Sequence, residues 1–77
     1  MKKSREELLK QGNEYSTQFF NWRECLIRRY ARFLRLYELD APANVTRKEV
    51  ALIHEAEAEY EKYESLAKSA AQELGYL

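Results

Sequence analysis

Residues 19–37 read FFNWRECLIRRYARFLRLY, and their apolar pattern is the strongest indication of the fold. Large apolar side chains return there at spacings of three, four and seven residues, which is the period of one face of an α-helix. No proline or glycine interrupts the stretch, so the pattern predicts one long amphipathic helix with a wide apolar face. The members of that face are Phe19, Phe20, Leu26, Ile27, Tyr30, Phe33, Leu34 and Tyr37.

Residues 53–74 carry a second, narrower apolar row at seven-residue spacing. Its members are Ile53, Ala56, Tyr60, Tyr63, Ala67, Ala70 and Leu74. A narrow row can cover only part of a wide one, so we expect the first helix to keep uncovered apolar surface. We therefore expect the chain to complete its core with a second chain.

The start of the first helix has a clear signal. Ser4 followed by Glu7 matches a capping box, in which two side chains satisfy free backbone N–H groups. The helix is expected to run from about residue 4 to residue 39. Gly12-Asn13 interrupts the pattern, and glycine costs about 1 kcal/mol inside a helix. The dipeptide leaves open a short N-terminal helix broken at this point.

Residues 40–46 form the only convincing linker. Pro42 pushes the residue before it out of the helical region, and Thr46 with Glu49 matches a second capping box. The second helix is therefore predicted over about 47–74. A linker this short favours antiparallel neighbours, so residues 1–77 are predicted to form one all-α domain, an antiparallel helical hairpin. The expected pairing places Leu26 opposite Tyr60.

Size and charge limit the class of protein. The chain has 77 residues, 34% of them charged, and no net charge. Residues 1–39 hold nine Lys/Arg and five Glu, whereas residues 40–77 hold four Lys/Arg and eight Asp/Glu. Halves of opposite charge suit a self-docking hairpin and weaken the case for a nucleic-acid binder. A lone hairpin of this size buries little, so we expect a homo-oligomer or a complex with another chain.

Neither a membrane span nor a secreted protein is indicated. No run approaches the ~18–20 apolar residues of a membrane-spanning helix, so no membrane partner is expected. The single cysteine, Cys25, cannot form an internal disulfide and suits a reducing compartment. We expect a cytoplasmic location.

No motif for catalysis or metal binding is present. His54 is the only histidine, and Ala58 stands where a zinc-protease helix needs a second one. Cys25 has no histidine near it in sequence, and the glutamates between residues 55 and 64 alternate around the helix. The sequence predicts no enzyme, no cofactor and no metal site.

Arginines supply the most specific surface signal. Arg28, Arg32 and Arg35 share one face of the first helix. Arg and Trp are enriched at protein-binding hot spots, so we predict a partner-binding surface there. Its members are Trp22, Arg28, Arg29, Arg32, Arg35 and Leu36. The alternatives are a row of cations matched to nucleic-acid phosphates, or a solvated face.

Arg23 falls inside the apolar arc of the first helix, where an arginine must be paired. The expected partner is Glu64, which would form a structural ion pair with Arg23.

In shape alone, the predicted hairpin resembles the plasmid copy-number RNA-binding repressors, which form four-helix bundles; no motif of that family is present. In size and composition the chain resembles accessory proteins of phages and other mobile elements, including inhibitors of host defence systems. These patterns favour a non-catalytic module that binds and modulates or inhibits an unidentified partner protein. The alternatives are an RNA- or DNA-binding hairpin that uses the arginines, and a structural subunit that assembles with itself.

Overall fold

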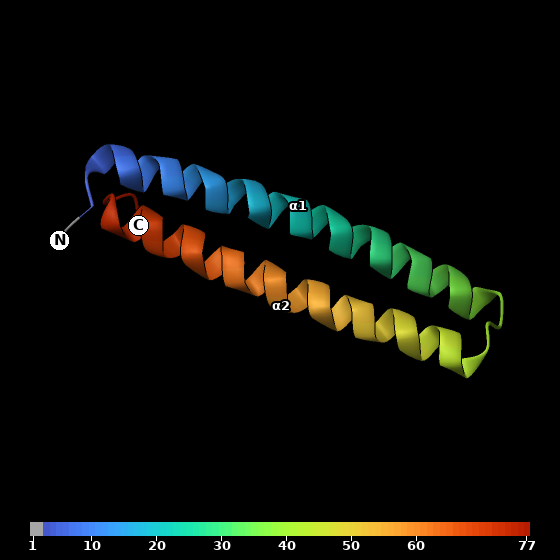
Figure 1. Cartoon of the computed structure of the whole chain (residues 1–77). Helices are drawn as coiled ribbons and strands as arrows, with labels where there is room; N and C mark the ends of the chain where they lie inside the picture. Colours follow the sequence, from blue (N-terminus) through green and yellow to red (C-terminus); the bar gives the residue numbers. More distant parts are fainter. Residues whose placement is uncertain (1–2) are drawn as a thin grey trace.

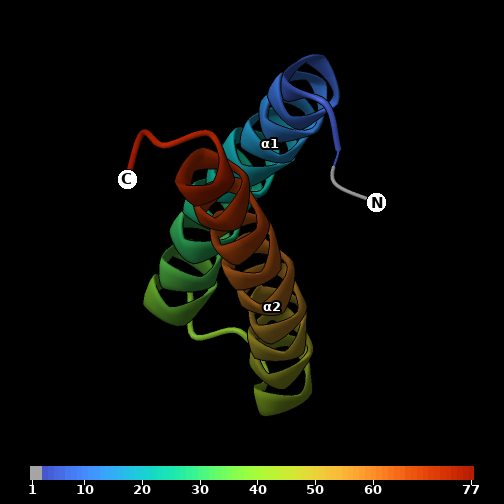
Figure 2. The same ribbon diagram turned by 90° about the vertical axis from the view of Figure 1, so that its left-hand side faces the viewer.

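The computed structural model describes residues 3–77 as two helices, α1 (Arg5–Glu38) and α2 (Ala43–Glu73). The helices run antiparallel, with both chain ends at one end of the molecule and the linker at the other (Figure 1). The molecule is elongated, with extents of 54 × 18 × 17 Å, and the two helix axes cross at an angle (Figure 2). The predicted all-α antiparallel hairpin is confirmed.

α1 begins where the sequence predicts and continues without a break. The Ser4 hydroxyl accepts a hydrogen bond from the backbone N–H of Glu7 at 3.2 Å, which caps the helix. Gly12 lies inside α1, and a methyl group added to it would stand 3.6 Å from the Cβ of Ala70. Gly12 therefore faces α2 and does not break the helix. The alternative of a separate N-terminal helix therefore does not occur.

α2 begins four residues earlier than predicted. Its N-cap is Pro42, whose φ of −56° already suits a helix start, so Ala43 and the residues after it join the helix. The predicted capping box is wrong because Thr46 lies inside the helix, where its hydroxyl donates to the carbonyl of Ala43 at 3.0 Å. Asp40 reverses the chain with a left-handed φ of 52°, a conformation that aspartate tolerates.

The earlier start of α2 shifts the pairing of the helices by one to two turns. Tyr60 stacks on Phe19, with ring centroids 4.8 Å apart, and does not lie opposite Leu26. Leu26 packs instead with Ile53 and Ala56. The predicted register is therefore wrong, and its error follows from the linker length.

One row of side chains from each helix forms the contact between them, which we call the seam. Both rows alternate spacings of three and four residues, as in antiparallel coiled coils. On α1 the row is Leu8, Gly12, Tyr15, Phe19, Trp22, Leu26, Arg29, Phe33 and Leu36. On α2 it is Thr46, Glu49, Ile53, Ala56, Tyr60, Tyr63, Ala67, Ala70 and Leu74.

The core of the seam is small. Within residues 3–77, the buried apolar side chains are Leu26, Ile53, Ala56 and Ala70. No large side chain of the described chain is fully buried. The hairpin thus buries little apolar surface for its length.

Candidate protein-binding surface

A second apolar row runs along α1 outside the seam, and we call it the exposed stripe. Its members are Phe20, Arg23, Ile27, Tyr30, Leu34 and Tyr37. The exposed fractions of its apolar side chains are 54% for Phe20, 58% for Ile27, 45% for Tyr30, 60% for Leu34 and 72% for Tyr37. Single exposed apolar residues are ordinary, but a contiguous row of large ones marks an interaction site.

The exposed stripe lies directly beside the seam. Each of its residues follows a seam residue in the chain, as Phe20 follows Phe19 and Ile27 follows Leu26. Successive residues of an α-helix are rotated by about 100°, so the two rows form neighbouring faces of α1. A single helix packed on one face leaves the other uncovered. The uncovered surface that the wide apolar face predicted is present, and it consists of this stripe.

Tyr30 connects the exposed stripe to α2. Its hydroxyl donates a hydrogen bond to a carboxylate oxygen of Glu57. This hydrogen bond, then burial and the negative charge of Glu57, raise the pKa of Tyr30 above its ordinary value. Glu57 also lies 3.8 Å from Nδ1 of His54, so the α2 edge of the stripe is polar. The stripe is therefore bounded on this side by acidic and histidine side chains.

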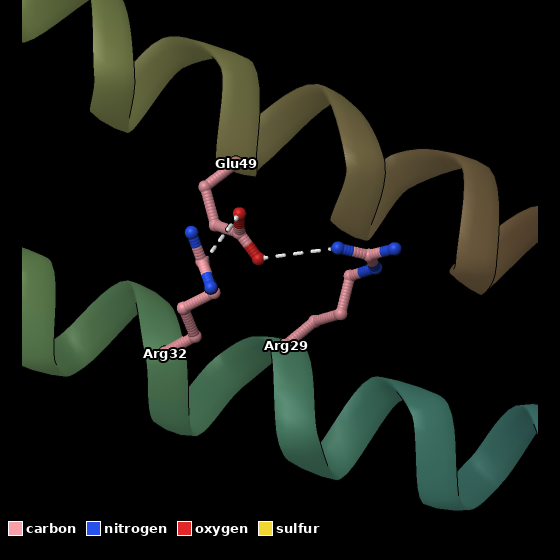
Figure 3. A network of polar contacts seen from close by, with 3 residues as sticks. All are labelled: Arg29, Arg32 and Glu49. Carbon is pink, nitrogen blue, oxygen red and sulfur yellow. Dashed lines mark ion pairs between the residues drawn. The ribbon is translucent and has the colours of Figure 1, made fainter.

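Two of the predicted arginines, Arg29 and Arg32, contact the carboxylate of Glu49, a residue that was predicted to form a capping box. Oε1 of Glu49 lies 3.5 Å from Nη1 of Arg29, and Oε2 of Glu49 lies 3.3 Å from Nε of Arg32. Figure 3 shows the carboxylate between the two guanidinium groups, which lie one turn apart on α1. The Glu49 side chain is 6% exposed, whereas Arg29 and Arg32 are 34% and 67% exposed.

The sequence carried a signal for this arrangement. Glu49 lies four residues before Ile53 and seven before Ala56, so it continues the apolar row of α2 toward its N-terminus. A carboxylate in such a row must be paired across the seam, because burying an unpaired charge costs several kcal/mol. The predicted capping box gave Glu49 a local role at the start of the helix, and so no partner on the first helix was expected for it.

The six residues predicted to bind a partner differ in their exposure. Trp22 packs against the core cluster of the seam, and Leu36 is half-buried in the same row. Arg29 is occupied by Glu49 in that row. Arg28 is exposed and lies 3.6 Å from Glu24, one turn earlier on the same helix.

Arg35 is exposed and makes no ion pair within residues 3–77. Among the described residues, Arg35 is therefore the arginine of the predicted row that has no ion pair.

The predicted Arg23–Glu64 ion pair is absent from the described structure. Glu64 accepts a hydrogen bond from Lys68 at 2.8 Å, which raises the pKa of Lys68. Arg23 is exposed in the stripe and has no ion pair with any residue between 3 and 77. The prediction assumed that α2 covers Arg23, and in the hairpin solvent covers it instead.

No group of three or more His, Cys, Asp or Glu among the described residues is arranged to hold a metal ion. Cys25 is a free, half-buried thiol beside the seam. Neither helix of the described chain contains a stretch long and apolar enough to cross a membrane.

Comparison with known proteins adds no assignment: no protein-family model, curated protein or solved structure matches the chain.

Proposed function

We propose that this chain is a non-catalytic module that binds and modulates another protein through the exposed stripe of α1. The observation that carries the proposal is the row of five large apolar side chains, each 45–72% exposed at heptad spacing. This spacing is the one that an amphipathic helix of a partner can match by inserting its own side chains between those of α1.

The composition of the stripe suits protein recognition. Three of its apolar members are aromatic, namely Phe20, Tyr30 and Tyr37. Aromatic side chains bring large contact area at low cost in conformational entropy and are enriched at interface hot spots. Arg23 stands within the row as its only charged side chain, and an acidic group of the partner helix would match it.

The arginine row gives weaker support to nucleic-acid binding. A row of phosphates needs free cations at regular spacing. Here Arg29 and Arg32 share the carboxylate of Glu49, and Arg28 has Glu24 beside it. These carboxylates lower the positive charge that the row would offer to phosphates, so protein is the favoured partner.

A photo-crosslinking experiment tests the proposal. Leu34 is replaced by p-benzoylphenylalanine, which places the reactive group on the stripe, and a matched chain carries it at Ala51, an exposed position on α2. Irradiation in an extract of the source cells should give a discrete crosslinked protein from position 34 alone. Nuclease treatment should leave the product unchanged.

Two further variants make the test specific to the stripe. Ile27→Glu places a charge in the apolar row and should abolish the crosslink, whereas Ala51→Glu adds the same charge elsewhere and should preserve it. Capture of the same protein from position 34 both with and without Ile27→Glu would contradict the proposal. Loss of the product on nuclease treatment would favour the nucleic-acid alternative.

A further inference from the structure

We infer that a second copy of this chain occupies the exposed stripe when no other protein covers it. The two α1 helices would lie antiparallel about a two-fold axis near residues 28–29, and the two hairpins would form a four-helix bundle. This inference rests on the proposed function, because it assumes that the stripe is a binding surface, and it names the occupant.

The small core supplies the first argument. The seam buries four apolar side chains, two of them alanines, and no large side chain of residues 3–77 is fully buried. Chains below ~70–80 residues rarely reach adequate stability from one such core, and oligomerisation is a common remedy. The additional burial of apolar surface that the single hairpin lacks is needed whenever the chain is folded. A second copy is the one partner that is present wherever the chain is made.

The spacing of the stripe supplies the second argument. Its residues are separated by three, four, three, four and three positions, a pattern that reads the same in both directions. An antiparallel copy therefore matches the whole row. Phe20 meets Tyr37 of the partner subunit, Arg23 meets Leu34 of the partner subunit, and Ile27 meets Tyr30 of the partner subunit. Such self-complementarity is what a two-fold interface requires.

Charge complementarity supplies the third argument. In this pairing Glu24 and Arg35 of the partner subunit are offset by two residues along the helix axes. At a rise of 1.5 Å per residue, this offset is about 3 Å. Arg35 makes no ion pair in the described hairpin. Arg23 lies about one turn from Glu38 of the partner subunit, and both side chains are exposed in the single hairpin. The second copy therefore brings carboxylates to both unpaired arginines of this face.

The available area is sufficient for a dimer. At about 200 Å² for each large side chain, the exposed fractions of the five apolar residues amount to roughly 550 Å² per chain. Two copies would bury roughly 1,100 Å² from these side chains alone, which clears the ~1,000 Å² expected of a biological interface and lies just below the ~1,200–2,000 Å² of stable ones. Arg23 and the rim residues add to this area.

The oligomeric state tests the inference. Light scattering and sedimentation of the purified chain should give the mass of two copies. Ile27→Glu should give the mass of one copy at the same concentration, and Ala51→Glu should leave the dimer intact. A dimer that Ile27→Glu leaves unchanged would show that the copies meet elsewhere, which would overturn the inference.

Label distances test the orientation in chains whose stripe is intact. In a Cys25→Ser background, spin labels are attached at Ala31→Cys, near the proposed axis, or at Lys10→Cys, far from it; both positions are exposed. Labels at position 31 should be separated by less than about 25 Å, given interaxial distances near 10 Å. Labels at position 10 should be separated by roughly 55 Å along the helices. Short distances at both positions would indicate parallel helices and refute the arrangement.

The outcomes separate this inference from the proposed function. A folded monomer that still gives the stripe-dependent crosslink would refute the second copy and leave the proposed function standing. A dimer that depends on the stripe, with no crosslink to any other protein, would support the second copy and refute the proposed function. If Ile27→Glu fails to fold, the label distances still decide the arrangement.

Discussion

The two helices of the hairpin differ in the number of apolar rows that they carry. α1 has two neighbouring rows, the seam and the exposed stripe, whereas α2 has one, in which alanine is the most frequent residue. The surface of α2 beside the stripe holds Glu57, which contacts Tyr30, and His54. The difference shows that apolar periodicity reports how many contacts a helix can make. It does not report which row meets the neighbouring helix.

A buried charge decides which row of α1 faces α2. Glu49 lies in the only apolar row of α2 and needs cationic partners when it is buried. The seam row of α1 contains Arg29 at the matching level, with Arg32 one turn away. The exposed stripe offers only Arg23, which lies nearer the middle of the helix. Pairing α2 with the seam row therefore satisfies Glu49, and pairing it with the stripe would not.

Two isoleucines give the largest contrast between the rows. Ile53 in the seam is 5% exposed and Ile27 in the stripe is 58% exposed. Ile53→Ala should lower the free energy of unfolding by about 2–4 kcal/mol, because it removes buried methyl groups and leaves a cavity. This is a large part of the total of about 4–12 kcal/mol expected for a chain of this length. Urea denaturation followed by circular dichroism measures it.

Ile27→Ala is the matched variant in the exposed stripe, and its free energy of unfolding is compared with that of Ile53→Ala. In dilute solution, where copies are separated, it should cost less than about 1 kcal/mol because its side chain already faces solvent. At high chain concentration its cost should grow, since dimers are stabilised by mass action and the variant weakens the contact. Equal effects of Ile53→Ala and Ile27→Ala in dilute solution would contradict the assignment of the two rows.

The Glu49 cluster gives the next largest effect. Arg29→Met should lower the free energy of unfolding by about 1–3 kcal/mol, because it leaves a buried carboxylate with one partner. Arg32→Met should cost at most about 1 kcal/mol, since Arg32 is more exposed and its contact is better screened. Thermal unfolding of both variants measures the difference.

A double variant tests whether the charge causes the loss. Arg29→Met combined with Glu49→Leu replaces the ion pair by apolar side chains and should recover most of the stability. A double variant as unstable as Arg29→Met alone would show that Arg29 acts through packing and not through Glu49.

The residues that were predicted correctly are those whose role depends on local pattern. The hairpin, the Ser4 cap, the apolar row of α2 and the surplus apolar surface of α1 follow from periodicity and capping chemistry. The start of α2 was missed because Pro42 can act as an N-cap as well as a breaker, and the register error follows from that boundary. The predicted binding role of Trp22 depends on which face of α1 meets α2, which no local pattern determines. Self-association and partner binding stay predictions.

The two glycines of the chain should respond in opposite ways to replacement by alanine. Gly12→Ala should raise the free energy of unfolding by about 0.5–1 kcal/mol, because alanine favours the helix and the new methyl group meets Ala70 at an ordinary 3.6 Å. Gly75→Ala is the opposite case, since Gly75 ends α2 with a left-handed φ of 85°. It should cost about 1–2 kcal/mol. Thermal unfolding of the two variants should therefore move in opposite directions. A loss of stability in Gly12→Ala would show that the helices approach more closely than the structure indicates.

The hydrogen bond between Tyr30 and Glu57 joins the two helices, and its loss should have the smallest effect on stability of the changes considered. This hydrogen bond raises the pKa of Tyr30, so an absorbance titration of the protein should contain a tyrosine component that ionises above the ordinary value. Because the folded pKa is raised, the contact stabilises the fold fully below the ordinary tyrosine pKa of about 10, and this contribution is lost as pH rises through the folded value. Glu57→Gln should remove the component that ionises at higher pH, because the hydrogen bond and the negative charge that raise the pKa of Tyr30 are then weakened or lost.

The same titration reports on the second copy. In the proposed dimer Ile27 of the partner subunit lies against Tyr30, and added burial disfavours the charged phenolate. The pKa of Tyr30 should therefore rise further as the chain concentration increases, and Ile27→Glu should abolish this concentration dependence. A raised pKa that stays the same at all concentrations would confine the effect to the Glu57 contact, and it would place the exposed stripe in solvent in the pure protein.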